Sequence, residues 1–282
     1  MKIGVAIMGG TGFGAGELLR LIANHPNITV VAVTSRSAAG NKISTVHPHL
    51  AKVVESVFVN EIPADAFKGF DHACIISALP HGESAKAIES VLAQFPNAKV
   101  IDLSGDLRIQ DLEMHQQHYK STADHQELRK KAVYGLSESN RNAIETAKVV
   151  ANPGCLATAA ILSLLPFANS EVKSYHMHLA TGSSGSGKEP KVATHHPVRH
   201  ANFLAYKVLA HQHVPEVIQC LNTAGVKLDS LPFVAHSLPI SRGILCTAFV
   251  ELQKPMTQPE VESLFEARYK DCPFVRLTGN RL

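Results

Sequence analysis

Cys155 stands directly after the turn Asn152-Pro153-Gly154, and the apolar residues 156–165 that follow predict a helix beginning at this cysteine. A helix N-terminus presents unpaired backbone N–H groups and a partial positive charge, which stabilise a thiolate and an oxyanion formed on it. The position makes Cys155 a candidate nucleophile. The alternative is structural, because Asn-Pro-Gly is a common turn and the residue after it can be a plain buried cap.

Two histidines, His211 and His213, follow an apolar segment at 203–209 that predicts a strand. A neutral imidazole takes and returns a proton near pH 7, as a thiolate mechanism requires. The chain holds 16 histidines, however, and most of them must serve elsewhere. His-x-His and His195-His196 are weak signals for a metal site, because no carboxylate or cysteine completes a ligand set. We therefore expect no bound metal.

A glycine-rich segment, Gly9 to Gly16, lies between a short apolar run and a helical pattern, and Gly10-x-Gly12-x-x-Ala15 fits the dinucleotide fingerprint. Glycines permit the tight turn and let the backbone approach a pyrophosphate at the helix N-terminus. After the next predicted strand the chain reads Ser35-Arg36-Ser37 where an NAD enzyme carries Asp or Glu. Arginine beside hydroxyls suits a 2′-phosphate, which favours NADP(H) over NAD(H). A plain glycine turn and a solvated basic turn are the alternatives.

Two arginines are candidates for binding a carboxylate or phosphate, although each could form a surface ion pair instead. Arg108 ends the segment IDLSGDLR and Arg242 lies in PISRG. The stretch 181–187, rich in Gly and Ser, is typical of a flexible linker, and it could also form an anion-binding loop of successive backbone N–H groups.

The order of apolar segments predicts the fold. In the first half, short strands alternate with helices, which is typical of a parallel, doubly wound α/β sheet of nucleotide-binding type, and the second half reads as α+β. We expect a Rossmann-type domain at 1–154 and a substrate domain at 155–282. The expected strands are 3–8, 28–34, 73–78, 99–103, 174–180, 203–209, 233–240 and 243–252, and the expected helices are 17–22, 83–92, 155–165 and 214–224.

Composition excludes several classes of protein. The 282 residues are 45% hydrophobic with a net charge of +3, so a sizeable core is available and no nucleic-acid partner is implied. Five cysteines without a CxxC pair suggest neither a disulfide framework nor a zinc site. No apolar run approaches a membrane span or a signal peptide. These features predict a soluble, cytoplasmic protein.

Nine segments together resemble the N-acetyl-gamma-glutamyl-phosphate reductases of the aspartate-semialdehyde dehydrogenase superfamily. The resemblance extends from Ile3 to about Arg276, and the segments occur in the family's order. The segments are GGTGFGAGELL, TSRS, ALPHG, IDLSGDLR, VYGLSE, NPGCLATAAIL, GSSGSGKEP, YKVLAHQHVPEV and SRGIL.

The resemblance implies NADPH-dependent reduction of an acyl phosphate to a semialdehyde through a cysteine thioester, in arginine biosynthesis. It implies that Cys155 accepts the acyl group and that His211 is the general acid and base, with His213 a weaker candidate. It places Arg108, Arg242, His213 and Glu216 in the substrate pocket. The residues that it implies for NADP(H) are Gly9, Thr11, Gly12, Phe13, Gly14, Ser35, Arg36, Ser37, Leu79, Pro80 and Ser186. By analogy the protein is a homo-oligomer, either a dimer or a tetramer.

Members of this family usually continue past residue 282 with a strand and a Gly-rich helix that returns to the first domain. We therefore expect either a truncated or a naturally short form. Three other functions stay open: a carrier-protein-linked aminoadipate or glutamate phosphate reductase of lysine biosynthesis, a non-redox Cys/His acyltransferase or hydrolase, and a dinucleotide-sensing protein.

Overall fold

A computed structural model describes residues 1–119, 125–226 and 228–279 of the protein. The chain divides into two units. Unit 1 contains Met1–Gly135 and Asn140–Pro153, and unit 2 contains Leu136–Ser139 and Gly154–Leu282. The chain passes into unit 2 between Pro153 and Gly154, one residue before Cys155. The last three residues of the expected short C-terminus, 280–282, lie outside the described residues.

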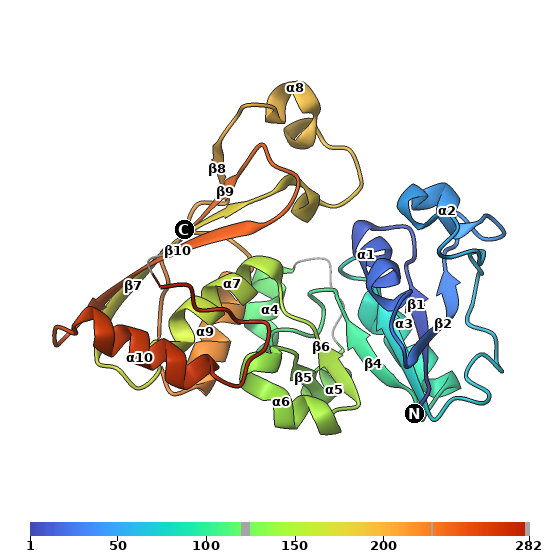
Figure 1. The fold of residues 1–282 in the computed structure, drawn as a ribbon, viewed down its shortest axis with the longest axis horizontal. Coiled ribbons are helices and arrows are strands. Elements are labelled where there is room, and N and C mark those ends of the chain that lie inside the picture. The colour runs from blue at the N-terminus through green and yellow to red at the C-terminus, as the bar shows by residue number, and fades with distance from the viewer. Residues whose placement is uncertain (120–124, 227, 280–282) are drawn as a thin grey trace. The chain divides into compact units, whose positions relative to one another are not determined.

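Unit 1 is built on a six-stranded sheet in which every neighbouring pair is parallel, in the order β2-β1-β3-β4-β6-β5 (Figure 1). The central strand β1 is buried from Gly4 to Met8, which explains its continuous apolar sequence, since a parallel strand is covered on both faces. The strands are β1 (Ile3–Met8), β2 (Ile28–Thr34), β3 (His72–Ser77), β4 (Lys99–Asp102), β5 (Ala132–Tyr134) and β6 (Val149–Ala151).

Helices cover both faces of this sheet, so the predicted doubly wound α/β class is confirmed. Leu19 and Ile22 pack in one buried cluster with Val5, while Ile88 and Val91 pack in a second cluster on the other face. The helices are α1 (Phe13–Ile22), α2 (Ile43–Val46), α3 (Ser84–Gln94), α4 (Leu112–His118), α5 (Gln126–Lys131) and α6 (Ser137–Thr146), whose first three residues belong to unit 2.

Unit 2 contains a mixed four-stranded sheet in the order β10-β7-β9-β8, with one parallel pair, β7 and β9. Helix α7 packs against α9, β7 and β10. None of the described helices is long and apolar enough to cross a bilayer. The elements are α7 (Cys155–Leu164), β7 (Val172–Thr181), α8 (His196–Arg199), β8 (Leu204–Tyr206), α9 (Val214–Thr223), β9 (Phe233–Ser237), β10 (Ile244–Leu252) and α10 (Gln258–Tyr269).

The strand expected at 203–209 is much shorter in the structure. It ends at Tyr206, because Lys207 and Leu209 adopt positive φ angles of 46° and 55°, which no strand can contain. The two histidines at 211 and 213 therefore follow an irregular turn rather than the end of a strand.

The parallel register brings the loops of unit 1 that carry the predicted site residues to one edge of the sheet. Met8 is paired with Thr34 on one side and with Ser77 on the other, and Ser77 is paired with Asp102. Asp102 is paired in turn with Ala151. The segments that follow these strands therefore leave the sheet side by side at its carboxyl edge, where ligands bind in open α/β sheets.

Close packing fixes the first of these loops. Gly9 has a φ of +78°, and a Cβ at this position would lie 2.8 Å from the carbonyl oxygen of Ala78. The N–H of Gly10 donates to Thr34 O at 2.8 Å. The backbone of the loop is thus held between the ends of β2 and β3, where no side chain fits.

Replacing Gly10 by alanine puts a methyl carbon 2.3 Å from Val33 Cγ1, so that β2 must shift. We expect the free energy of unfolding to fall by about 1–3 kcal/mol, the usual cost of overpacking. Gly12→Ala is the matched control and should cost less, because a Cβ there meets nothing within 4 Å. Urea unfolding measures both, and equal losses in the two variants would contradict the packing argument.

Candidate functional site

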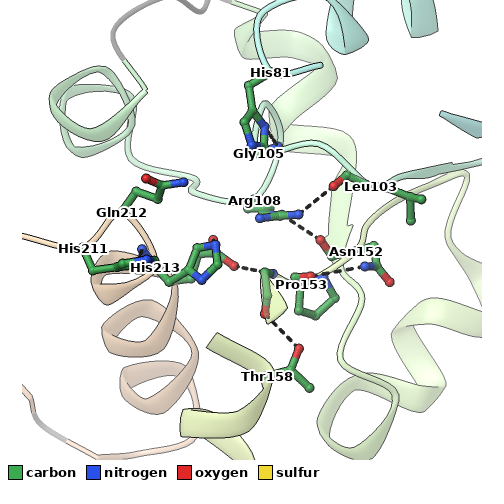
Figure 2. A network of polar contacts seen from close by, with 12 residues as sticks. His81, Leu103, Gly105, Arg108, Asn152, Pro153, Thr158, His211, Gln212 and His213 are labelled. Atoms are coloured by element: carbon green, nitrogen blue, oxygen red, sulfur yellow. Dashed lines mark hydrogen bonds and ion pairs between the residues drawn. The ribbon is translucent and has the colours of Figure 1, made fainter. Parts of the chain in front are cut away.

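Cys155 is the first residue of α7 and its side chain is exposed, whereas Leu156 and Ala157 after it are buried. Gly154 precedes it in extended conformation and makes no side-chain cap. The hydroxyl of Thr158 donates to Gly154 O at 3.0 Å, which closes the first turn (Figure 2). An exposed sulfur at the start of a ten-residue helix is well placed to ionise and to act as a nucleophile.

A fully buried carboxylate holds the turn in front of Cys155. Glu216, in the first turn of α9, accepts the N–H of Gly154 at 2.9 Å through Oε2. Its Oε1 lies 3.9 Å from Nε2 of His213, whose side chain is also buried. A Cβ at Gly154 would lie 2.5 Å from the same Nε2, so glycine is required for the imidazole to pack there. Glu216 thus links the turn to the imidazole.

The ring of His211 packs beside that of His213, but one of its ring nitrogens is bonded to the backbone. Its Nδ1 accepts the backbone N–H of His213 at 3.1 Å, and its ring contacts those of Tyr206, His213 and Phe233. Burial, followed by the charges of His213 and Lys207, lowers the pKa of His211 to about 3. The ring is therefore neutral near pH 7, and its acceptor nitrogen is committed to the backbone.

Tyr206 is a residue of this site that the sequence analysis did not single out. Burial raises the pKa of its phenol first, and the charge of Cys155 raises it further, so the two side chains interact. Its only sequence signal was its place at the start of the motif YKVLAHQHVPEV.

The Gly/Ser-rich stretch is ordered by backbone contacts with the segment that carries Arg242. Ser183–Ser186 forms a 3-10 helix, and the N–H of Ser184 donates to Ser241 O at 3.0 Å. A Cβ at Gly182 would lie 2.7 Å from Arg242 N, so the two segments pack backbone to backbone. Arg242 is exposed and Ser186 half-buried. Their roles in binding stay predictions.

In unit 1 the glycine loop is open at the start of α1. Gly12 is the N-cap of this helix and has no side-chain cap, and no acidic residue lies in the first turn. A Cβ at Gly14 would touch only Leu103, at 3.8 Å. Thr11 is half-buried and Phe13 is exposed. No side chain caps the backbone N–H groups at this helix start, and uncapped helix N-termini of this kind are typical binding sites for phosphate groups.

The segments after β2 and β3 lie at the same edge. The hydroxyl of Ser35 is buried and accepts the N–H of Ala38 at 3.2 Å, whereas Arg36 and Ser37 are exposed. After β3, Leu79 is half-buried and Pro80 is exposed. The residues predicted for the cofactor in unit 1 thus follow three adjacent parallel strands.

Arg108 is buried, and its guanidinium group holds two loops. Nε donates to Asn152 O and Nη2 donates to Leu103 O, each at 2.7 Å (Figure 2). These bonds connect the segment after β4 to the segment after β6. Arg108 therefore uses Nε and Nη2 to bind backbone oxygens, and a substrate carboxylate or phosphate would need such N–H groups. Its role in substrate binding stays a prediction.

The comparisons with known proteins cover nearly the whole chain. Residues 4–147 match the family model for the semialdehyde dehydrogenase NAD binding domain, and residues 155–281 match that for the semialdehyde dehydrogenase dimerisation domain. Proteins named N-acetyl-gamma-glutamyl-phosphate reductase are similar in sequence. That of Bacillus cereus (strain AH187) is 39% identical over 276 residues and that of Bacillus anthracis 38% over 280, in each case 97% of this chain and 79% of the relative.

Solved structures of aspartate semialdehyde dehydrogenases share the fold. Type II from Vibrio cholerae gives a TM-score of 0.64 at 15% identity, covering 95% of this chain and 79% of that one. The enzyme from Candida albicans, solved with NADP, gives 0.62 at 13% identity, covering 94% and 76%. Among the described residues of the present chain, no group of three His, Cys, Asp or Glu side chains could hold a metal ion.

Acid should destabilise the protein partly through His211. Its pKa of about 3 lies below the ordinary 6.5, so between these values the unfolded chain binds the proton more tightly. This contribution to stability is complete above pH 6.5 and falls as pH drops towards 3, by about 2 kcal/mol at pH 5. His211→Asn keeps an acceptor but does not titrate. Urea unfolding at pH 7 and pH 5 should show a smaller loss in this variant, and equal losses would contradict the assignment.

Proposed function

The chain belongs to the semialdehyde dehydrogenase family, and on this basis we propose that it reduces N-acetyl-gamma-glutamyl phosphate to the semialdehyde with NADPH, as in arginine biosynthesis. Relatives that carry the name of this reductase align with 97% of the chain. The observation that carries the proposal is the exposed thiol of Cys155 at the start of α7, behind a turn that the buried Glu216 fixes.

The cofactor is NADP(H), and the carboxyl edge of the unit 1 sheet fits it. The open start of α1 suits the pyrophosphate, and the exposed Arg36 beside two serines suits a 2′-phosphate. When bound, NADPH supplies the reducing equivalents. The residues that we propose to hold it are Gly9, Thr11, Gly12, Phe13, Gly14, Ser35, Arg36, Ser37, Leu79 and Pro80 from unit 1 and Ser186 from unit 2.

We propose that the thiolate of Cys155 attacks the carbonyl carbon of the acyl phosphate. A carbon–sulfur bond forms and the carbon–oxygen bond to phosphate breaks. Inorganic phosphate is released, and the acyl group remains bound to Cys155 as a thioester. Backbone N–H groups at the start of α7 stabilise the oxyanion, and losing one such donor typically costs about 2–4 kcal/mol of barrier. After reduction, release of the semialdehyde returns the thiolate.

Proton transfer is assigned to the imidazole pair. The sequence analysis preferred His211 as the general acid and base, but two contacts support His213 in this role. Nε2 of His213 packs against Gly154, the residue before the nucleophile, and lies beside the carboxylate of Glu216. His211 has a low pKa and its Nδ1 receives a backbone N–H, so it is a weak base that positions His213.

The remaining assignments follow the family. We propose that Arg108, Arg242, His213 and Glu216 contribute to the substrate pocket and that residues 1–154 bind the cofactor while 155–282 form the catalytic domain. The match of 155–281 to a dimerisation domain supports a homo-oligomer, either a dimer or a tetramer. All five cysteines are free thiols, which supports a reducing, cytoplasmic location.

Cys155→Ser should abolish turnover, because an alcohol at this position lacks the nucleophilicity of a thiolate. The assay is the phosphate-dependent reduction of NADP⁺ with N-acetylglutamate semialdehyde, followed by nicotinamide absorbance. We expect kcat to fall at least about a thousandfold. Cys272→Ser is the control for a cysteine outside the site, and its kcat should equal that of the wild type.

Three results would contradict the proposal. A Cys155→Ser variant with the wild-type rate would exclude the thioester. Wild-type cleavage of the acyl phosphate without any change in nicotinamide absorbance would indicate an acyltransferase or hydrolase. Faster turnover of an aminoadipate semialdehyde derivative would indicate the carrier-linked substrate of lysine biosynthesis.

Matched asparagine variants separate the two histidines. His213→Asn should lower kcat by about 10²–10⁴-fold, the usual contribution of a general acid or base. It should also remove the limb of the pH–kcat profile that reports this imidazole. His211→Asn keeps an acceptor for the N–H of residue 213 and should lower kcat much less. The opposite order would return the role to His211.

A further inference from the structure

Two loops at the carboxyl edge of the unit 1 sheet are joined by reciprocal hydrogen bonds. The loop after β3 contains residues 78–83, and the loop after β4 contains residues 103–111. Asp106 in the second loop accepts the N–H of Gly82 at 2.8 Å through Oδ1 and the N–H of Ala85 at 3.1 Å through Oδ2. In the other direction, the N–H of Gly105 donates to Nδ1 of His81 at 2.6 Å.

Asp106 also serves as the cap of α3. The residue at the N-cap position, Glu83, makes no side-chain cap, and the N–H of Ala85 is satisfied by Asp106 from across the loop. A carboxylate at a helix N-terminus is favoured both by the hydrogen bond and by the helix dipole. The first turn of α3 is therefore fixed by a residue more than twenty positions further along the chain.

Buried polar groups hold Asp106 in place. Its side chain is almost fully buried, and its N–H donates to the hydroxyl of Ser104 at 3.1 Å. Ser104 in turn donates to Asp102, which also accepts the hydroxyl of Ser84 at 2.6 Å. Both aspartates thus bind the start of α3 from the same segment, and the carboxylate of Asp106 has little freedom to move.

The segment that Asp106 binds is part of the proposed cofactor site. Leu79 and Pro80 lie between the end of β3 and Gly82, whose N–H receives one carboxylate oxygen. Arg108, whose guanidinium holds the loops after β4 and β6, lies two positions after Asp106. One short segment therefore fixes the backbone beside the cofactor and the arginine assigned to the substrate.

We propose that Asp106 is a positioning residue for NADP(H). One carboxylate oxygen holds Gly82 and the other holds Ala85 at the start of α3, so that segment 79–82 keeps the shape that receives the cofactor. This inference rests on the proposed function for the identity of the cofactor. It concerns a residue of the segment IDLSGDLR that lies outside the glycine-rich dinucleotide fingerprint, and it requires no contact between Asp106 and the cofactor.

The test is NADPH binding without substrate, followed by the fluorescence of the reduced nicotinamide. In Asp106→Asn the amide nitrogen cannot accept an N–H, so one of the two backbone bonds is lost. We expect the Kd for NADPH to rise about tenfold, as for the loss of a hydrogen bond to a charged group. Asp111→Asn is the matched control. It removes the same charge five residues away, where the exposed side chain accepts the N–H of Met114, and its Kd should stay within about twofold.

Two further readouts distinguish positioning from general destabilisation. Amide hydrogen exchange of the cofactor-free protein should accelerate at Gly82 or Ala85, whichever loses its acceptor in Asp106→Asn, and stay unchanged in the strands of the unit 1 sheet. In steady state, KM for NADPH should rise while kcat at saturating NADPH changes little. If Asp106→Asn does not fold, His81→Leu breaks the reciprocal bond from an exposed position and should also raise the Kd, whereas His81→Asn, which keeps an acceptor, should restore it.

The outcomes separate this inference from the proposed function. Unchanged NADPH affinity in Asp106→Asn, or an equal rise in Asp111→Asn, would overturn the positioning role. A wild-type protein that binds NADPH but reduces no acyl phosphate would overturn the proposed reaction, while the Kd values would still decide the role of Asp106. Absence of NADPH binding by the wild type would overturn both.

Discussion

The hydrogen bond from the N–H of Gly154 to the buried carboxylate of Glu216 is the contact on which the proposed chemistry depends. It fixes the backbone one residue before Cys155, and it keeps a negative charge beside His213. Burying a carboxylate is costly unless its oxygens are satisfied, so the site is stable only while the turn and the imidazole are both in place. One side chain therefore contacts both the backbone beside the proposed nucleophile and the imidazole proposed for proton transfer.

Unit 1 follows the same principle with different residues. The loops at the carboxyl edge of a parallel sheet have no ladder partners of their own, and buried side chains bind their backbone instead. Arg108 donates to two carbonyl oxygens, while Asp106 accepts two N–H groups. Charged groups make stronger hydrogen bonds than neutral ones, which suits loops that must keep their shape without regular structure. Charged side chains thus hold the loop backbone at the edge where we propose that the cofactor binds.

The sequence allowed the parallel sheet, the glycine loop and the helix at Cys155 to be predicted, because each depends on local pattern: buried apolar strands, glycines after β1, and a turn before an apolar run. It did not allow the partners of Glu216 or Asp106 to be predicted, since these are backbone groups 62 residues away from Glu216 and 24 and 21 residues away from Asp106. The strand expected at 203–209 failed for a related reason. Its apolar residues suit a strand, but the backbone turns at Lys207 to bring the histidines into a buried cluster.

Burial also distinguishes Cys155, the proposed nucleophile, from other cysteines of the chain. Desolvation raises the pKa of Cys74 to about 11 and raises those of Cys220 and Cys246, so these groups stay protonated and behave as small apolar side chains. Cys155 alone of the five is exposed, and it lies at the positive end of a helix. A thiolate is the reactive form of a cysteine, so the exposure of Cys155 and the backbone N–H groups at the start of α7 support its proposed role as the nucleophile.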